Sequence, residues 1–403
     1  MPRAVSQPLR HSPVRRLLCV LVLACLGVMA SVPSASAATQ WELDPTFGAA
    51  GSLVLPADHA VYEVRSAADG GFWVLGVRED VVTSRPMVGK VSADGVPDPG
   101  FGSGGFSLDL TNVGRATDIV ELSDGDLLVS IDVSAGGMRT WRLAPDGSAR
   151  VSWGTAGVLT VGDPSYRAEL LALTPDGNVI IAGERHTGGP VSYISTARLD
   201  VAAEALDPAF GIGGVRDSDS SVSNTFGTAG PAALLVAPDG SITIAYQYFS
   251  LYVERYLPDG TFNTSFAGDG TVVDPTGLDP VAQGFSLDAG GTLSYAHEFA
   301  ISDPEDPQGV IVKGIGGDGT AQPGYGVAGA AAREIETIEN DSLSVTGHAR
   351  LPDGSSLVTG GIWGSVDNSA FSVRMTPEGT VDTTHGFDGV AAMPTAPLVT
   401  DGI

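Results

Sequence analysis

Short apolar runs alternate with turn residues along most of this chain. Runs rich in Val, Ile, Leu or Phe, such as 72–77, 178–182 and 241–246, each follow an Asp-Gly turn. Asp-Gly between apolar runs is a strong hairpin signal, because glycine adopts a positive φ at little cost. No long segment shows the 3.6-residue apolar period of an amphipathic helix. The pattern therefore predicts an all-β chain.

A five-residue signal, aromatic-Gly-x-x-Gly, divides the chain into repeats of 52 to 60 residues. Two copies depart from it, with Ala267 in place of the first glycine and His385 in place of the aromatic residue. Seven copies bound six intervals, and an aspartate turn stands near the middle of each interval. The aromatic position is occupied by Phe47, Phe101, Trp153, Phe210, Phe266, Tyr325 and His385. A repeat of this length is typical of propellers and other repeat architectures.

Two further residue types keep the same phase. A basic residue precedes a second turn in every repeat, at Lys90, Arg142, Arg198, Arg255, Lys313 and Arg374. An acid or amide stands three residues before the aromatic position in most copies, at Asp44, Asp98, Asp207, Asn263, Gln322 and Asp382, whereas the third copy has Arg150. We expect each basic residue to pair with a nearby aspartate. We expect each aromatic ring to pack between neighbouring repeats.

Each repeat has room for four antiparallel strands. We expect the first to follow the Gly-x-x-Gly loop, as at 52–55 and 271–274, the second and third to flank the midway turn, and the fourth to carry the basic residue. Four strands in roughly 40–60 residues match a propeller blade, which buries its faces against its neighbours. We therefore predict a six-bladed β-propeller, with seven blades as the alternative. The partial seventh copy, 385–393, would add a strand that closes the ring against the N-terminal blade.

Two segments carry a resemblance to a known family. The sequences at 43–48 (Leu-Asp-Pro-Thr-Phe-Gly) and 206–211 (Leu-Asp-Pro-Ala-Phe-Gly), with the turn at Asp353-Gly354, resemble the signature of the delta-60 repeat family of bacterial proteins. The resemblance covers nearly all of 38–403, although the third, fifth, sixth and last copies depart from the signature. It implies a secreted, β-propeller-like repeat protein, and it brings no catalytic residues with it.

The first 37 residues have the three parts of a secretory signal peptide. Four arginines precede an apolar run at 17–29, and Ala35-Ser36-Ala37 is a small-x-small cleavage signature. We therefore expect 38–403 to be a single propeller domain secreted from the cell. We do not favour a lipoprotein anchored at Cys25, because the residues before it match a lipobox poorly. Cys19 and Cys25 are the only cysteines, so the secreted chain would hold no disulfide or thiolate metal site.

The strongly negative net charge argues against some classes of binding partner. Removal of 1–37, with its four arginines and no acid, would make the formal net charge of −26 four units more negative. Nucleic-acid binders carry basic patches and anionic membranes attract basic segments, so neither partner is expected. No second apolar run is long enough to span a membrane. We expect a monomer.

The midway aspartates are the candidate ligand-binding residues. In a propeller the turns at one end of the blades share a face, so these aspartates and the acids of the second turns would form an acidic face. That face suits a basic partner or Ca²⁺. No Asp-x-Asp-x-Asp-Gly loop is present, so we predict no cofactor and keep Ca²⁺ as an alternative. The midway aspartates are Asp69, Asp124, Asp176, Asp239, Asp288 and Asp353.

Catalytic motifs are missing from the sequence, with neither Gly-x-Ser-x-Gly nor His-Glu-x-x-His present. His297-Glu298 and His348 are the histidine positions that could meet near one face of a propeller. Our leading hypothesis is a secreted, non-enzymatic binding module for a protein or small-molecule ligand. A Ca²⁺-dependent propeller hydrolase or lactonase and a structural protein of the envelope remain as alternatives.

Overall fold

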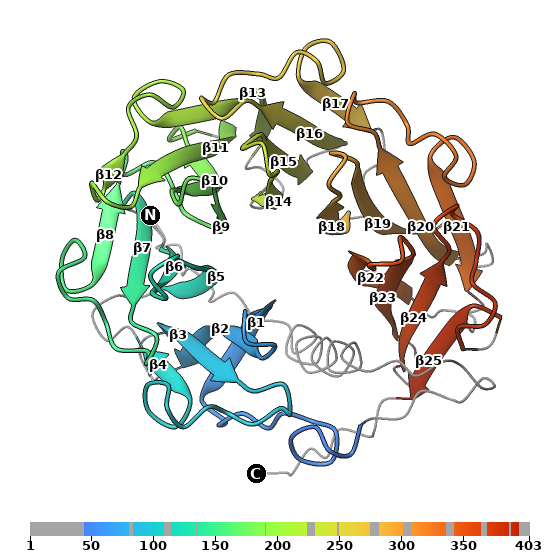
Figure 1. The fold of residues 1–403 in the computed structure, drawn as a ribbon, viewed down its shortest axis with the longest axis horizontal. Helices are drawn as coiled ribbons and strands as arrows, with labels where there is room; N and C mark the ends of the chain where they lie inside the picture. The colour runs from blue at the N-terminus through green and yellow to red at the C-terminus, as the bar shows by residue number, and fades with distance from the viewer. Residues whose placement is uncertain are drawn as a thin grey trace, which may run out of the picture. The chain divides into compact units, whose positions relative to one another are not determined.

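The computed structural model describes most of the chain after residue 43. The expected signal peptide, 1–37, lies outside the described residues. These residues contain no helix and form six antiparallel sheets (Figure 1), so the predicted all-β, six-bladed propeller with four-stranded blades is confirmed. The described residues are 44–79, 84–108, 114–133, 136–189, 191–223, 230–247, 250–274, 282–300, 308–335, 342–363, 369–386 and 388–394.

Every sheet is built from strands that follow one another along the chain. The first sheet contains β1 (His59–Ser66), β2 (Phe72–Glu79), β3 (Ser84–Val91) and β4 (Phe106–Leu108). The second contains β5 (Arg115–Glu121), β6 (Leu127–Asp132), β7 (Met138–Leu143) and β8 (Val158–Val161). The third contains β9 (Leu170–Leu173), β10 (Val179–His186) and β11 (Val191–Asp200), and both the short β12 (Ala205–Leu206) and β13 (Val215–Ser223) pair with β11.

The last three sheets repeat the same order. The fourth contains β14 (Pro231–Val236), β15 (Ile242–Gln247), β16 (Leu251–Tyr256) and β17 (Thr271–Asp274). The fifth contains β18 (Gln283–Leu287), β19 (Leu293–Ala300), β20 (Gln308–Ile315) and β21 (Ala330–Ile335). The sixth contains β22 (Ser342–Arg350), β23 (Ser356–Trp363), β24 (Ser369–Met375) and β25 (Val390–Pro394). In five sheets the first strand is therefore one edge and the last strand is the other, whereas in the third β12 and β13 share the edge beside β11.

The expectation that the strand after each Gly-x-x-Gly loop is the first strand of its own sheet is wrong. The strand after each Gly-x-x-Gly loop is the last strand of the preceding sheet, because it pairs with the strand that carries the basic residue, as Val272 of β17 pairs with Val253 of β16. The C-terminal strand β25 likewise completes the sixth sheet by pairing with β24. The surplus copy is the first one: Ser52 makes only an isolated bridge to Gly48.

Connection lengths separate the two ends of every sheet. Five residues join the first strand to the second in all six sheets, and 14 residues separate the third strand from the outer edge strand in all six. The connections at the opposite end vary: three to seven residues join the second strand to the third, and six to eight lead to the next sheet. We call these the constant end and the variable end of a sheet. Both recurring turns of the repeat lie at the constant end.

The first sheet has a core cluster of its own, and in the other five sheets the core lies between consecutive sheets. The first sheet belongs to one compact unit, Leu43–Thr117 with Asp146–Ser148, and nearly all of the other five belong to a second. Within the second unit, alternate residues of a strand face opposite neighbours. On β10, Val179 and Ile181 pack with the second sheet, whereas Ile180 and Ala182 pack with Tyr246 of the fourth. No helix long and apolar enough to cross a membrane occurs in the described part of the chain.

Candidate functional site

The midway aspartates first build their own turns. The carboxylate of Asp69 accepts the backbone N–H of Gly71, and those of Asp239 and Asp353 accept the N–H and the hydroxyl of the serine two residues later. A hydrogen bond from Ser355 is the largest cause that lowers the pKa of Asp353. Such turns use the short aspartate side chain to replace a backbone partner. These carboxylates therefore have a local role in the turn.

The recurring basic residues bind the same carboxylates in four of the six sheets. Lys90 lies 2.8 Å from Asp69, Arg142 lies 2.5 Å from Asp124, Arg374 lies 2.5 Å from Asp353, and Arg198 pairs with Asp176. Three of these cations also reach the aspartate that stands three residues before the aromatic position. The distances are 3.5 Å for Lys90 to Asp98, 3.3 Å for Arg198 to Asp207 and 3.5 Å for Arg374 to Asp382. Each cation thus links the two constant-end turns of its own sheet.

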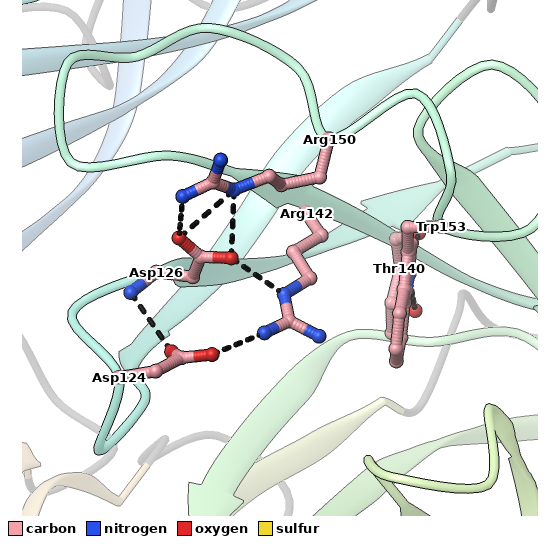
Figure 2. Close-up of polar contacts among 6 residues, drawn as sticks. All are labelled: Asp124, Asp126, Thr140, Arg142, Arg150 and Trp153. Atoms are coloured by element: carbon pink, nitrogen blue, oxygen red, sulfur yellow. Dashed lines mark hydrogen bonds and ion pairs between the residues drawn. The ribbon is translucent and has the colours of Figure 1, made fainter.

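The second sheet keeps this link although its charges are rearranged. Arg150 replaces the usual aspartate, and Asp126 supplies the missing carboxylate, as Figure 2 shows. Asp126 accepts hydrogen bonds from Arg150 at 2.6 Å and from Arg142 at 2.9 Å, and its side chain is only 6% exposed. Burial tends to raise the pKa of Asp126, but the hydrogen bonds and charges of the two arginines outweigh burial and lower it. Arg142 also lies over the ring of Trp153.

Arg255 and Lys313 bind partners on neighbouring sheets. Arg255 is buried against the ring of Phe266 and donates to the carbonyl oxygens of Gly291 and Gly317 in the fifth sheet. Burial lowers the pKa of this guanidinium. Lys313 lies 2.8 Å from Asp274, at the end of the last strand of the fourth sheet. Neither Asp239 nor Asp288 forms an ion pair with a described residue.

The six aromatic residues at these positions are buried and His385 is half-buried, and the loops that carry the aromatic residues are hydrogen-bonded to the next repeat. Phe101, Phe210 and Phe266 have no exposed surface. The residue after each aromatic residue donates its backbone N–H to the next repeat. The acceptor is the backbone carbonyl of the acid in the second turn of that repeat: Gly102 donates to Asp146, and Gly326 donates to Glu378. The third sheet has no acid in register at that turn. There the carboxylate of Glu204 replaces the carbonyl and accepts the N–H of Gly154 at 3.2 Å.

His297 and Glu298 lie on opposite faces of β19, so the histidine positions that could have met near one face do not form one group with Glu298. The ring of His297 stacks beside Tyr295, which packs against the fourth sheet, whereas Glu298 faces the sixth and accepts the N–H of Val345. His348 donates from Nδ1 to the carbonyl of Gly284 at 2.6 Å, and burial lowers its pKa to about 4. Successive side chains of a strand point to opposite faces, so His297 and Glu298 point away from each other on β19. No cluster of three or more His, Cys, Asp or Glu able to hold a metal occurs among the described residues.

A polar group at the variable end of the third sheet was not predicted from the sequence. Glu184 and His186 lie two residues apart on β10 and share one face, and Ser192 on β11 stands directly opposite His186. The Nε2 atom of His186 lies 3.3 Å from Glu184, and its Nδ1 atom lies 3.3 Å from the Ser192 hydroxyl. On the other face, Arg185 pairs with Asp217 and lies over Tyr166. The only sequence signal was the interruption of an apolar strand by three polar residues.

Comparison with known proteins yields structural neighbours alone. No family model and no curated protein matches the chain. A Bacteroides caccae protein of unknown function is 12% identical, with a TM-score of 0.40 over 79% of this chain and 97% of that one. Chaetomium thermophilum Sqt1, bound to the N-terminus of a ribosomal protein, is 13% identical, with a TM-score of 0.39 over 77% and 70%. The polysaccharide lyase Uly1 is 8% identical, with a TM-score of 0.41 over 92% and 94%.

Proposed function

We propose that this protein is an exported, non-enzymatic binding module that holds its ligand at the variable ends of its sheets. The observation that carries this proposal is the contrast in connection lengths. The constant-end connections keep five and 14 residues in every sheet, whereas those at the variable end differ from sheet to sheet. A scaffold that presents variable loops on rigid strands is a common basis of recognition.

The contacts at the constant end support a structural role for that end. Its aspartates are engaged in turn hydrogen bonds, and four of them pair with the recurring cations. Exposed pairs of this kind contribute at most about 1 kcal/mol each. A ligand that used these carboxylates would compete with contacts that hold the turns. We therefore place recognition at the other end, and regard the acidic turns as scaffold.

The sequence of 1–37 supports export, and the repeat signature supports membership of the delta-60 repeat family. Both are proposals that rest on sequence motifs alone. Export is tested by fractionating cells that produce the full chain and sequencing the N-terminus of the exported protein. We expect it to begin at about residue 38.

Capture experiments with the exported protein, 38–403, test the binding function. We expect at least one saturable partner at roughly micromolar concentration or below, which is typical of specific interfaces. In one variant the connection between β19 and β20 is shortened from seven residues to three, the length found between β15 and β16. In the matched variant, Asp353→Asn alters the constant end. The first should weaken capture and the second should not, and the reverse ranking would reject our placement of the ligand. The absence of any saturable partner, with or without calcium, would reject the function.

A further inference from the structure

One hydrogen bond recurs at the variable end, from the first strand of a sheet to the second strand of the sheet before it. Gln247, the sixth residue of β15, accepts the backbone N–H of Ala282, just before β18, at 3.0 Å. Glu298, the sixth residue of β19, accepts the backbone N–H of Val345 on β22 at 3.0 Å. In both cases a buried backbone donor of one sheet is satisfied by a side chain of the sheet before it.

Glu184 occupies the same position in the third sheet, but its usual donor is missing. It is the sixth residue of β10 and, with Ile180 and Ala182, faces the fourth sheet. The register shows which residue should supply the N–H. Val345 pairs with Gly360, the fifth residue of β23, and Pro231 pairs with Tyr246, the fifth residue of β15. Pro231 therefore occupies in the fourth sheet the position that Val345 occupies in the sixth. Proline has no backbone N–H, so it cannot donate the hydrogen bond that Val345 donates.

The carboxylate of Glu184 is consequently buried without a hydrogen-bond donor. The residue is 1% exposed, and neither Oε1 nor Oε2 receives a hydrogen bond from a described residue. Glu254, the other buried glutamate at the junction of the third and fourth sheets, accepts bonds from Tyr246, Tyr256 and the N–H of Asp219. Buried carboxylates are normally satisfied in this way, because burial of a bare charge is costly.

Among the described residues, neither a lysine nor an arginine forms an ion pair with Glu184. The nearest titratable neighbour of Glu184 is His186, whose Nε2 lies 3.3 Å away and whose side chain is 25% exposed. Arg185 points to the opposite face of β10, where it pairs with Asp217.

We propose that Glu184, at the junction of the third and fourth sheets, binds an ammonium or guanidinium group of the ligand. The inference rests on the proposed binding function and specifies the chemistry of its ligand. The N–H donors of such a group replace the backbone N–H that Pro231 removes, and its charge matches the carboxylate. An organic cation fits better than a divalent metal, because the described residues place no third His, Asp, Glu or Cys beside Glu184 and His186.

Small probes test this site without knowledge of the natural ligand. Butylammonium and butylguanidinium chloride are titrated into the exported protein by calorimetry, with butylurea as the uncharged probe. We expect the two cations to bind and butylurea not to bind. Glu184→Gln should weaken the cations at least about tenfold, since it removes the charge and keeps the shape. The matched variant Glu298→Gln, whose acceptor oxygen already has the Val345 donor, should bind them as the wild type does.

Pro231→Ala is the complementary test, because it restores the missing N–H. We expect this variant to bind the cations at least about tenfold more weakly and to unfold at a higher temperature than the wild type. Loss of proline also gives the unfolded chain more freedom, which lowers stability. A higher unfolding temperature therefore reports the new hydrogen bond to Glu184.

Two results would overturn the proposal. One is equal cation binding by the wild type and Glu184→Gln. The other is no cation binding by the wild type while Pro231→Ala raises the unfolding temperature, which would make Glu184 a buried acceptor with no ligand. Failure of the binding function is distinguished separately: a captured partner that Glu184→Gln still binds would keep the function and reject this site.

Discussion

Asp126 shows how one repeat retains a contact after its charges have changed. In the first, third and sixth sheets the cation meets an aspartate from each of the two turns. In the second sheet Arg150 stands where that second aspartate would be, and Asp126 lies between the two arginines. The side chains differ, but a carboxylate still joins the two constant-end turns. These four sheets therefore share the contact rather than a particular residue.

This rearrangement predicts a rescue by double substitution. Arg150→Asp alone places a second carboxylate beside Asp126, and we expect it to lower the free energy of unfolding by about 2–3 kcal/mol. The double variant Arg150→Asp with Asp126→Ser restores the pattern of the sixth sheet, where Ser355 takes the place of Asp126. We expect most of the loss to be recovered. Urea unfolding of the wild type, both single variants and the double variant measures the coupling, and purely additive effects would contradict the exchange.

Gly284 is a position in the fifth sheet at which the backbone leaves no room for a side chain. Its φ is +59°, and a Cβ would lie 1.9 Å from the backbone nitrogen of His348. We expect Gly284→Ala to destabilise the fold by more than about 3 kcal/mol. Gly188 is the matched control, because its φ is +79° and no atom lies within 4 Å of a Cβ there. Its alanine variant should cost only about 1 kcal/mol, measured by chemical denaturation. Equal losses would show that backbone strain, and not the contact with His348, dominates.

Repetition determined which residue contacts could be predicted from the sequence. The cations and turn aspartates keep a common phase, so their pairing follows from the repeat pattern itself. Arg150 was visible only as a departure, because nothing in the period identifies Asp126 as its partner. Glu184 was harder still: its significance depends on the register that places Pro231 opposite it, and register is a property of paired strands.

At the level of elements, the clasp between an aromatic loop and the next turn links consecutive repeats. In most copies both partners are backbone atoms, so the clasp depends little on sequence. In the third sheet it depends on one side chain, Glu204, which accepts the N–H of Gly154. That sheet also contains the additional short strand β12 beside the displaced turn. A side-chain acceptor thus compensates for a turn that has changed shape.

Substitution of Glu204 tests this compensation. We expect Glu204→Ala to lower the free energy of unfolding by about 1 kcal/mol, because the N–H of Gly154 loses its acceptor. Glu204→Gln keeps a carbonyl oxygen in the same place and should lose much less. Both are compared with the wild type by urea unfolding at one pH. If the two variants were equally destabilised, the charge of Glu204 would matter and the hydrogen bond would not.

The order of strands within a sheet could be predicted only in part. Four strands per repeat and the position of both turns followed from the Asp-Gly pairs. The partner of the strand after the Gly-x-x-Gly loop did not, because a periodic sequence looks the same whether that strand pairs backwards or forwards. Pairing of Val272 with Val253 shows that it pairs backwards. The 14-residue connection brings the chain back to the strand it has just left, which is the shorter loop to close.

At the scale of the whole molecule, buried histidines make the folded state less stable at acidic pH. His348 is neutral in the folded state, because burial lowers its pKa to about 4, and burial also lowers the pKa of His297. An unfolded histidine takes up a proton near pH 6.5. Between about pH 6.5 and 4 an unfolded His348 therefore binds more protons than the folded one, so stability falls as the pH falls, by up to about 1.4 kcal/mol per pH unit. His297 acts in the same direction.

His348→Asn removes one of these groups and keeps the contact. The asparagine amide takes the place of Nδ1 and can donate to the carbonyl of Gly284. We expect the variant to lose less stability than the wild type between pH 6.5 and 4, and to show a similar profile above pH 7. Thermal unfolding across this range is the measurement. Parallel profiles of the two proteins would show that His348 does not titrate on unfolding.

Each sheet consists of strands that follow one another in the chain, and this affects how a gene for such a protein can gain or lose repeats. Each sheet is formed by one continuous segment of the chain, and its two fixed-length connections lie inside that segment. Unequal crossing-over between the links that join one sheet to the next would insert or delete a complete sheet, together with both of its constant-end turns. Half-sheets with unpaired strands would not arise by that route. Relatives that differ in their number of intact sheets are therefore the expected products of duplication.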